Sequence, residues 1–153
     1  MQRDVQRDVQ RGVAPASRLD AGGWKPRLLD AMRRILVIED DRAAREVITR
    51  TLRTAGYQVL TATDGGEGLV VWEKEQPDLI VTDLHMPNVD GLEAIRALRG
   101  RGATIPIIAI SGGDSHRSYL ALESANDLGA TTVLEKPFDP QQLAAVVAKA
   151  LGD

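Results

Sequence analysis

Acidic residues stand at two points of the sequence where an apolar run ends, and this placement could support chemistry. Residues 35–41 read ILVIEDD, in which branched apolar residues lead directly into Glu39, Asp40 and Asp41, and Asp83 closes the later run LIVTD. Carboxylates beside a hydrophobic core are costly, because burial favours the neutral acid and like charges repel each other. A bound cation, a ligand or open solvent could each compensate this charge, and these residues alone leave the choice open.

A serine and a lysine hold comparable places later in the chain. Ser111 follows the apolar run IIAI, and Lys136 follows TTVLE. A hydroxyl and an ammonium around a carboxylate suit an incoming phosphoryl group, whose oxygens need donors and positive charge in the transition state. Asp83 is then a candidate nucleophile, and Mg2+ is the expected cation because it takes one or two protein carboxylates and keeps several waters. Each residue alone has an ordinary explanation, such as helix capping for the acids, and it is their joint placement that favours function.

Composition limits both the class of protein and the kind of metal site. The 153 residues are 43% hydrophobic and 27% charged, which suits one globular domain with a sizeable core. The chain has no cysteine and two histidines, so disulfides and thiolate sites are excluded and any metal should have oxygen ligands. No apolar run approaches about 18 residues and the N-terminus lacks a secretory signal, so we expect a cytoplasmic protein without membrane contact.

The first 31 residues differ in character from the rest of the chain. They carry six basic and four acidic groups, whereas residues 32–153 carry thirteen basic and eighteen acidic ones. Residues 2–13 form the tandem repeat QRDVQRDVQRGV, for which disorder is favoured over a short helix because isolated segments of this length are marginal in water. We therefore expect a disordered extension at 1–31 and a folded, acidic domain at 32–153.

Strand and helix patterns alternate through that domain and must position the polar residues. Apolar strands are predicted at 34–38, 57–62, 78–83, 105–111 and 131–135. Helices are predicted at about 41–55, 64–75, 90–99, 114–128 and 139–151, with Asp64 and Asp139 as N-caps. Near-continuous apolar strands joined by helices indicate a parallel sheet covered on both faces, which is a doubly wound α/β domain. Ligands of such sheets bind at the carboxyl ends of the strands, where these polar residues gather.

From Met32 to Leu151 the sequence resembles the receiver domain of two-component response regulators. The matching segments are LVIEDD, LIVTDLHMPNVDG, IIAISGG and LEKPF, in the order and spacing of that family. The resemblance implies a flavodoxin-like sheet with strand order 2-1-3-4-5 and five helices. It also implies that a sensor histidine kinase or a histidine phosphotransfer protein transfers a phosphoryl group to the domain in a Mg2+-dependent reaction, with Mn2+ as an alternative ion.

The resemblance assigns a role to each candidate residue. Asp83 is expected to be the phosphoacceptor, and Ser111 and Lys136 are expected to contact the phosphoryl group. The implied metal ligands are Asp40 and Asp83 directly, Glu39 through water, and the backbone carbonyl of His85. The family usually has a cis peptide before the proline that follows the lysine, which here is the bond between Lys136 and Pro137.

Three further positions are expected to modulate the site. Members of the family carry an aromatic residue on the fifth strand that swings inward on activation, and here that position is Val133, so the usual aromatic signal is not expected. His85 and Gly113 match positions that flank the route of hydrolytic water and influence the lifetime of the phosphoryl group. His85 could shield the phosphoryl group or assist water, and the sequence leaves both open.

Two other functions compete with a phosphoaccepting signalling domain. A phosphohydrolase of the haloacid-dehalogenase kind also uses an aspartate nucleophile and Mg2+, but it needs a second acid two residues later, where this chain has His85. A binding module with the receiver fold that is not phosphorylated usually lacks the acceptor aspartate or the lysine, and this chain has both Asp83 and Lys136.

The sequence ends at Asp153, directly after the last predicted helix. We therefore expect a stand-alone receiver that signals by docking to an unidentified downstream protein or by onward transfer of the phosphoryl group. Because its folded part is acidic and has no basic helix, direct DNA binding is not expected.

Overall fold

The computed structural model of the protein describes residues 32–85, 91–112 and 123–153. The strands are β1 (Arg34–Ile38), β2 (Gln58–Ala62), β3 (Leu79–Asp83), β4 (Ile107–Gly112) and β5 (Thr132–Lys136). The helices are α2 (Arg42–Thr54), α3 (Gly65–Glu75), α4 (Gly91–Gly100) and α6 (Pro140–Leu151), and residues 123–128 are also helical. None of the helices in these ranges has the length and apolar character needed to cross a membrane. The extension expected at 1–31 lies outside the described residues.

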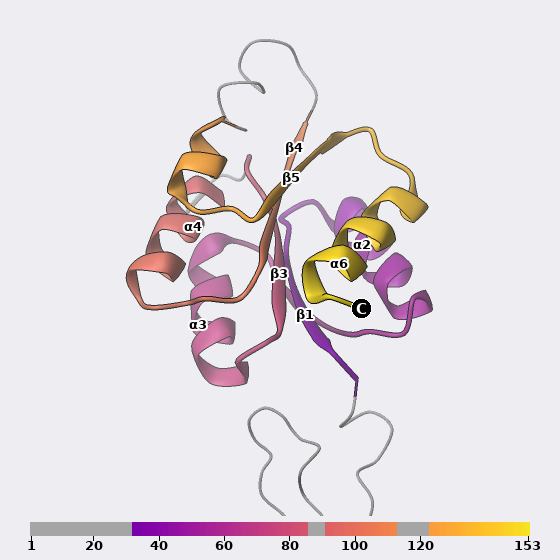
Figure 1. Cartoon of the computed structure of the whole chain (residues 1–153), viewed down its shortest axis with the longest axis horizontal. Helices are drawn as coiled ribbons and strands as arrows, with labels where there is room; N and C mark the ends of the chain where they lie inside the picture. Colours follow the sequence, from indigo (N-terminus) through magenta and orange to yellow (C-terminus); the bar gives the residue numbers. More distant parts are fainter. Residues whose placement is uncertain (1–31, 86–90, 113–122) are drawn as a thin grey trace, which may run out of the picture. The chain divides into compact units, whose positions relative to one another are not determined.

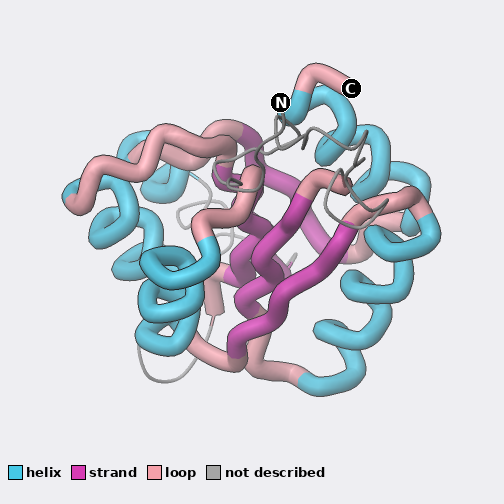
Figure 2. The backbone as a smooth tube through the Cα atoms, turned by 90° about the horizontal axis from the view of Figure 1, so that it is seen from below, coloured by secondary structure: helices cyan, strands magenta, loops and turns pink. Residues whose placement is uncertain are grey.

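All five strands run parallel, in the order β2-β1-β3-β4-β5. Helices α3 and α4 cover one face of this sheet, and α2 and α6 cover the other (Figure 1). Seen after a quarter turn, the strands form a twisted central layer with helices on both sides (Figure 2). The predicted doubly wound fold with flavodoxin-like strand order 2-1-3-4-5 and five helices is confirmed. Each parallel connection needs such a crossover helix, because a short turn cannot join two parallel strands.

Neighbouring residues of the central strands fill two separate cores. Leu36 of β1 is fully buried in the core beneath α3 and α4, where Trp72 also packs. Its neighbour Ile35 is fully buried in the other core, beneath α2 and α6, together with Leu52. A strand that is buried on both faces needs apolar residues at every position, which explains why the sequence of β1 shows no alternation. The strand ends at the site are therefore anchored from both sides.

Aspartates begin three of the helices. Asp41, Asp64 and Asp139 each occupy an N-cap, and each side chain accepts a hydrogen bond from the backbone N–H three residues later. Asp139 forms a complete capping box with Gln142, and Pro140 lies in the first turn of the same helix. Because the cap satisfies an N–H that the helix itself leaves unpaired, it fixes the residue at which the helix begins. The cap at Asp41 therefore sets the start of α2 directly after Glu39 and Asp40.

The register of the sheet brings polar residues from distant segments to one edge. Asp83 at the end of β3 pairs with Ile110 of β4, so Ser111 is the next residue along that strand. Ser111 and Gly112 in turn pair with Glu135 and Lys136 of β5. The carboxyl ends of these strands therefore present an acid, a hydroxyl and an ammonium side by side, as expected for a ligand site in a sheet of this kind.

The side chain of Arg99 binds the segments that precede β4 and β5, at the end of these strands opposite Ser111 and Lys136. Its Nε and Nη2 donate to the Gly129 carbonyl at 3.0 and 2.9 Å, and its Nη1 donates to the carbonyls of Ala103 and Ile105 at 2.9 and 2.8 Å. Burial lowers the pKa of Arg99, but a guanidinium stays charged in proteins. One charged side chain thus satisfies three backbone carbonyls in the connections on either side of β4.

Replacing Arg99 should therefore destabilise the fold. In Arg99→Ala these carbonyls lose their donor, and we expect the free energy of unfolding to fall by about 2–4 kcal/mol. The matched control is Arg96→Ala, which removes an exposed arginine from the same helix and should change stability by less than about 0.5 kcal/mol. Urea unfolding followed by circular dichroism measures both variants. Equal effects would contradict the assigned role of Arg99.

Candidate functional site

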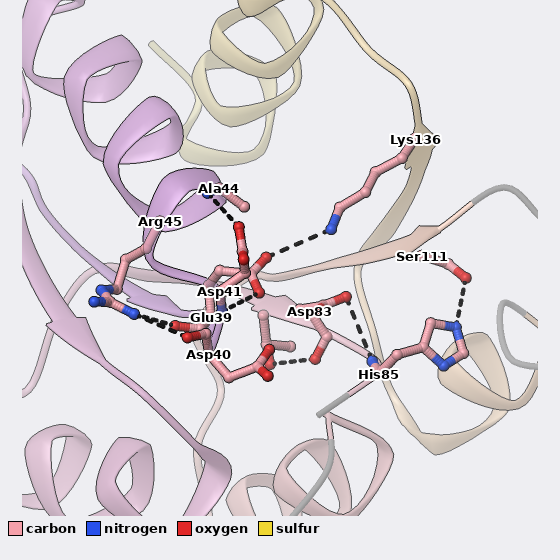
Figure 3. A network of polar contacts seen from close by, with 10 residues as sticks. Glu39, Asp40, Asp41, Ala44, Arg45, Asp83, His85, Ser111 and Lys136 are labelled. Atoms are coloured by element: carbon pink, nitrogen blue, oxygen red, sulfur yellow. Dashed lines mark hydrogen bonds and ion pairs between the residues drawn. The ribbon is translucent and has the colours of Figure 1, made fainter. Parts of the chain in front are cut away.

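Three carboxylates gather at the carboxyl edge of the sheet. Glu39 and Asp40 follow β1 and Asp83 ends β3, and one oxygen of each lies within 4.8 Å of the others. Glu39 is 1% exposed and Asp83 is 6% exposed, whereas Asp40 is open to solvent. Figure 3 shows the three side chains together with Lys136. The structure thus brings together the acids that the sequence singled out.

Glu39 is the electrostatically strained member of this cluster. Its pKa is raised from 4.5 to about 7, first by burial and second by the neighbouring Asp83 carboxylate. Two contacts offset part of this rise: the Asp41 N–H donates to Oε2 at 3.1 Å, and the Lys136 ammonium lies 3.5 Å from Oε1. The Lys136 contact is an ion pair without hydrogen-bond geometry, since among the described residues Oε1 finds no hydrogen-bond partner.

These features fit a hard divalent cation. Glu39 Oε1 has no hydrogen-bond donor among the described residues, and the Lys136 ammonium at 3.5 Å offsets only part of the charge of the three clustered carboxylates, so a cation would compensate the rest. Oxygen-only donors suit Mg2+ or Mn2+ better than softer metals. The exposed side of the cluster at Asp40 leaves access for the waters that Mg2+ retains.

The turn that carries two of the acids is held by Arg45. Its Nη1 donates to the carbonyl of Glu39 at 2.9 Å and to the carbonyl of Asp40 at 3.3 Å. These bonds fix the peptides from which both side chains project. This role of Arg45 was not predicted from the sequence. Its partners are backbone carbonyls, which every residue has, so no residue type at a given spacing indicates the contact. The one available signal was its place one turn after the N-cap Asp41.

Gly91 allows α4 to approach the backbone of the candidate acceptor. A Cβ atom added to Gly91 would lie 2.1 Å from the carbonyl oxygen of Asp83 and 2.7 Å from the Cα of Leu84. Both neighbours are backbone atoms, which cannot turn away as a flexible side chain could. The first residue of α4 therefore fits against the end of β3 only as glycine, a role that was not predicted from the sequence.

Ser111 and Lys136 reach the site from β4 and β5. Ser111 is fully buried, and its Oγ lies 3.1 Å from Nε2 of His85, whose backbone follows β3. Lys136 points toward Glu39 (Figure 3), and the peptide between Lys136 and Pro137 is cis, as the resemblance predicted. Both donors therefore already have partners in the structure.

The remaining predicted positions lie at the margin of the site. Val133 pairs with Ala109 of β4 and packs against the core beneath α3 and α4, so a branched aliphatic side chain stands where the resemblance expected a ring. Gly113 lies outside the described residues, and its influence on hydrolytic water stays a prediction.

Comparison with known proteins agrees with the fold. Residues 35–148 match the response regulator receiver domain. Over 112 residues the chain is 44% identical to the response regulator MprA of Mycobacterium tuberculosis, a match that covers 73% of this chain and 47% of that protein. A CheY-like receiver domain protein from Methanospirillum hungatei superimposes with a TM-score of 0.72, at 26% identity over 80% of this chain and 95% of the other. The chemotaxis protein CheY4 of Vibrio cholerae gives a TM-score of 0.71, at 32% identity over 79% of this chain and 100% of the other.

The chain therefore belongs to the response regulator receiver domain family. Aspartate phosphorylation and Mg2+ binding are characteristic of this family. The chain spans about half the length of the curated relatives it matches.

The raised pKa of Glu39 predicts a specific pH dependence of stability in metal-free buffer. Because the folded state binds this proton more tightly than the unfolded state, the contribution of Glu39 is fully present below about pH 4.5 and is lost as the pH rises through about 7. We expect a loss of about 2–3 kcal/mol across this window in the wild type. Glu39→Gln, which stays neutral, should not show it.

Urea unfolding with EDTA at about pH 5 and about pH 7.5 measures this difference. The control is Glu46→Gln, since Glu46 is an exposed acid on α2 and should leave the wild-type pH dependence unchanged. The same loss in Glu39→Gln as in the wild type would assign the pH dependence to other groups.

A second prediction concerns Gly91. Gly91→Ala should lower the free energy of unfolding by about 2 kcal/mol or more, because its methyl group forces the start of α4 away from the backbone of Asp83. The same variant should weaken Mg2+ binding, since Asp83 is one of the clustered acids. Gly100→Ala is the matched control in the same helix: a Cβ there meets no atom within 4 Å. Thermal unfolding measures the stability of both variants, and titration measures their Mg2+ affinity. Equal stability and equal affinity of the two variants would refute this role of Gly91.

Proposed function

We propose that Asp83 is the phosphoacceptor of this receiver domain and that the phosphoryl group comes from a sensor histidine kinase or a histidine phosphotransfer protein. The observation that supports this most directly is the carboxylate cluster: a largely buried aspartate at a strand end, with two further acids and a lysine around it. Membership of the receiver family supports the same reaction. The domain acts as a signalling element that assists its own phosphorylation.

In the proposed reaction, a carboxylate oxygen of Asp83 attacks the phosphorus of a phosphohistidine. A new O–P bond forms an acyl phosphate, the N–P bond breaks, and its electron pair returns to the imidazole of the donor. Lys136 supplies positive charge to the phosphoryl oxygens, and Ser111 supplies a hydroxyl donor. The long, partly exposed side chain of Lys136 can turn from Glu39 to the phosphoryl group without movement of β5.

The acidic cluster holds the ion that the reaction requires. When bound, Mg2+, or Mn2+ in its place, supplies positive charge beside the reacting oxygens. Asp40 and Asp83 are the proposed direct ligands, Glu39 acts through water, and the backbone carbonyl of His85 completes the protein's contribution. Two features support this assignment: the oxygen-only composition of the cluster, and Glu39 Oε1, which has an ion pair with Lys136 but no hydrogen-bond donor among the described residues.

The proposed output is docking to a downstream protein or onward transfer of the phosphoryl group. The phosphoryl contacts of Ser111 and Lys136 act on β4 and β5, and so on the helices that flank those strands. Because the chain covers about half of its curated relatives, the identity of the partner follows from neither the fold nor the site. A cytoplasmic location and the absence of direct DNA binding remain predictions from the sequence.

Intact-protein mass spectrometry after incubation with acetyl phosphate and Mg2+ tests the proposal. The wild type should gain one phosphoryl group, and EDTA or Asp83→Asn should abolish the gain. Asp127→Asn, which changes an exposed acid elsewhere in the domain, should leave it intact. An adduct that persists in Asp83→Asn would refute the assignment. A folded, Mg2+-binding wild type without an adduct would favour the phosphorylation-independent binding module.

A further inference from the structure

The imidazole of His85 makes a contact that the proposed phosphotransfer does not use. His85 follows β3 and is exposed, yet its Nε2 reaches the fully buried Oγ of Ser111 at 3.1 Å. Figure 3 shows the ring turned toward Ser111, while Lys136 is directed toward Glu39 on the other side of Asp83. The hydrogen bond thus joins the loop that follows the acceptor strand to the end of β4.

We propose that His85 is a positioning residue whose Nε2 accepts the O–H of Ser111 and holds it in a resting orientation, so that a phosphoryl group on Asp83 must displace this hydrogen bond to engage Ser111. The inference rests on the proposed function, because it concerns the same site. It gives His85 a role beyond shielding the phosphoryl group or assisting water, since the partner of its ring is a protein hydroxyl.

The hydrogen-bonding capacity of a serine explains why this contact competes with a phosphoryl group. A hydroxyl has one O–H donor, and a phosphoryl oxygen can only accept. When Nε2 carries no proton, it accepts the O–H of Ser111 and occupies that single donor. When Nε2 carries a proton, it donates to Oγ, and this hydrogen bond does not use the O–H of Ser111. The competition therefore belongs to the first tautomer, in which Ser111 must leave His85 or share its O–H before the phosphoryl group gains a full contact.

His85 contacts both the acceptor aspartate and the serine that it restrains. Its backbone N–H donates to Oδ1 of Asp83 at 3.4 Å, a long hydrogen bond, so the same residue contacts the acceptor through its main chain and Ser111 through its ring. A group added to Asp83 therefore arrives next to the residue that restrains Ser111. We infer that the stability of this restraint sets part of the free energy that phosphorylation must supply.

Binding of beryllium fluoride in the presence of Mg2+ tests the proposal, because this phosphoryl analogue needs no donor and can be titrated by calorimetry at fixed pH. His85→Phe keeps a ring but removes the hydrogen bond, and it should bind the analogue about fivefold more tightly, as expected for the net strength of one neutral hydrogen bond. His85→Gln, whose amide can still bond to the hydroxyl, should stay near the wild type. In a Ser111→Ala background, His85→Phe should change the affinity by less than about twofold, since the coupled partner is gone.

The outcomes separate this inference from the function on which it rests. A wild type that binds no beryllium fluoride would overturn both. A wild type that binds, with His85→Phe equal or weaker, would overturn the restraint alone and indicate that His85 helps to hold the phosphoryl group. As an independent readout, the His85 ring nitrogens should shift in NMR spectra of Ser111→Ala relative to the wild type. Unchanged ring resonances would also overturn the inference.

Discussion

The burial of two neighbouring carboxylates at the end of the sheet is the constraint on which the site depends. Glu39 and Asp83 are almost inaccessible to solvent, and burial together with the neighbouring Asp83 carboxylate raises the pKa of Glu39 to about 7. The protein offsets part of this cost with the Lys136 ammonium and the Asp41 N–H. The part of the electrostatic cost that is not offset favours a cation in the cluster and chemistry that places positive charge there.

The two cores make that arrangement rigid enough to persist. β1 and β3 are buried beneath helices on both faces, so the backbone from which the acids project cannot relax outward to separate the charges. Arg45 adds two hydrogen bonds to the acidic turn, and the contact at Gly91 places α4 directly against the end of β3. Like charges in a flexible loop would simply move apart, whereas here the fold holds them together and a bound ion can use their proximity.

The sequence predicted those features whose signals are local. The strands were recognisable from continuous apolar runs and two helix starts from Asp64 and Asp139, because capping depends on a side chain and its own backbone. The clustered acids were predictable because parallel strands end at one edge. Arg45 and Arg99 were not, because they bind backbone carbonyls, which every residue has. The contact between His85 and Ser111 was equally hidden, since the direction of a loop side chain depends on neighbours far along the chain.

The contacts that Ser111 and Lys136 make without a phosphoryl group also determine how strongly the site can respond to one. Ser111 is engaged by His85 and Lys136 by Glu39, so the two groups proposed to bind a phosphoryl group do not start without interactions. A conformational equilibrium shifts only by the difference in interaction free energy between its states. The net free energy available from new contacts to the phosphoryl group is therefore their interaction free energy minus that of the contacts they replace. With Val133 in place of a ring, this difference at Ser111 and Lys136 is the route that we propose for an effect of the site on β4 and β5.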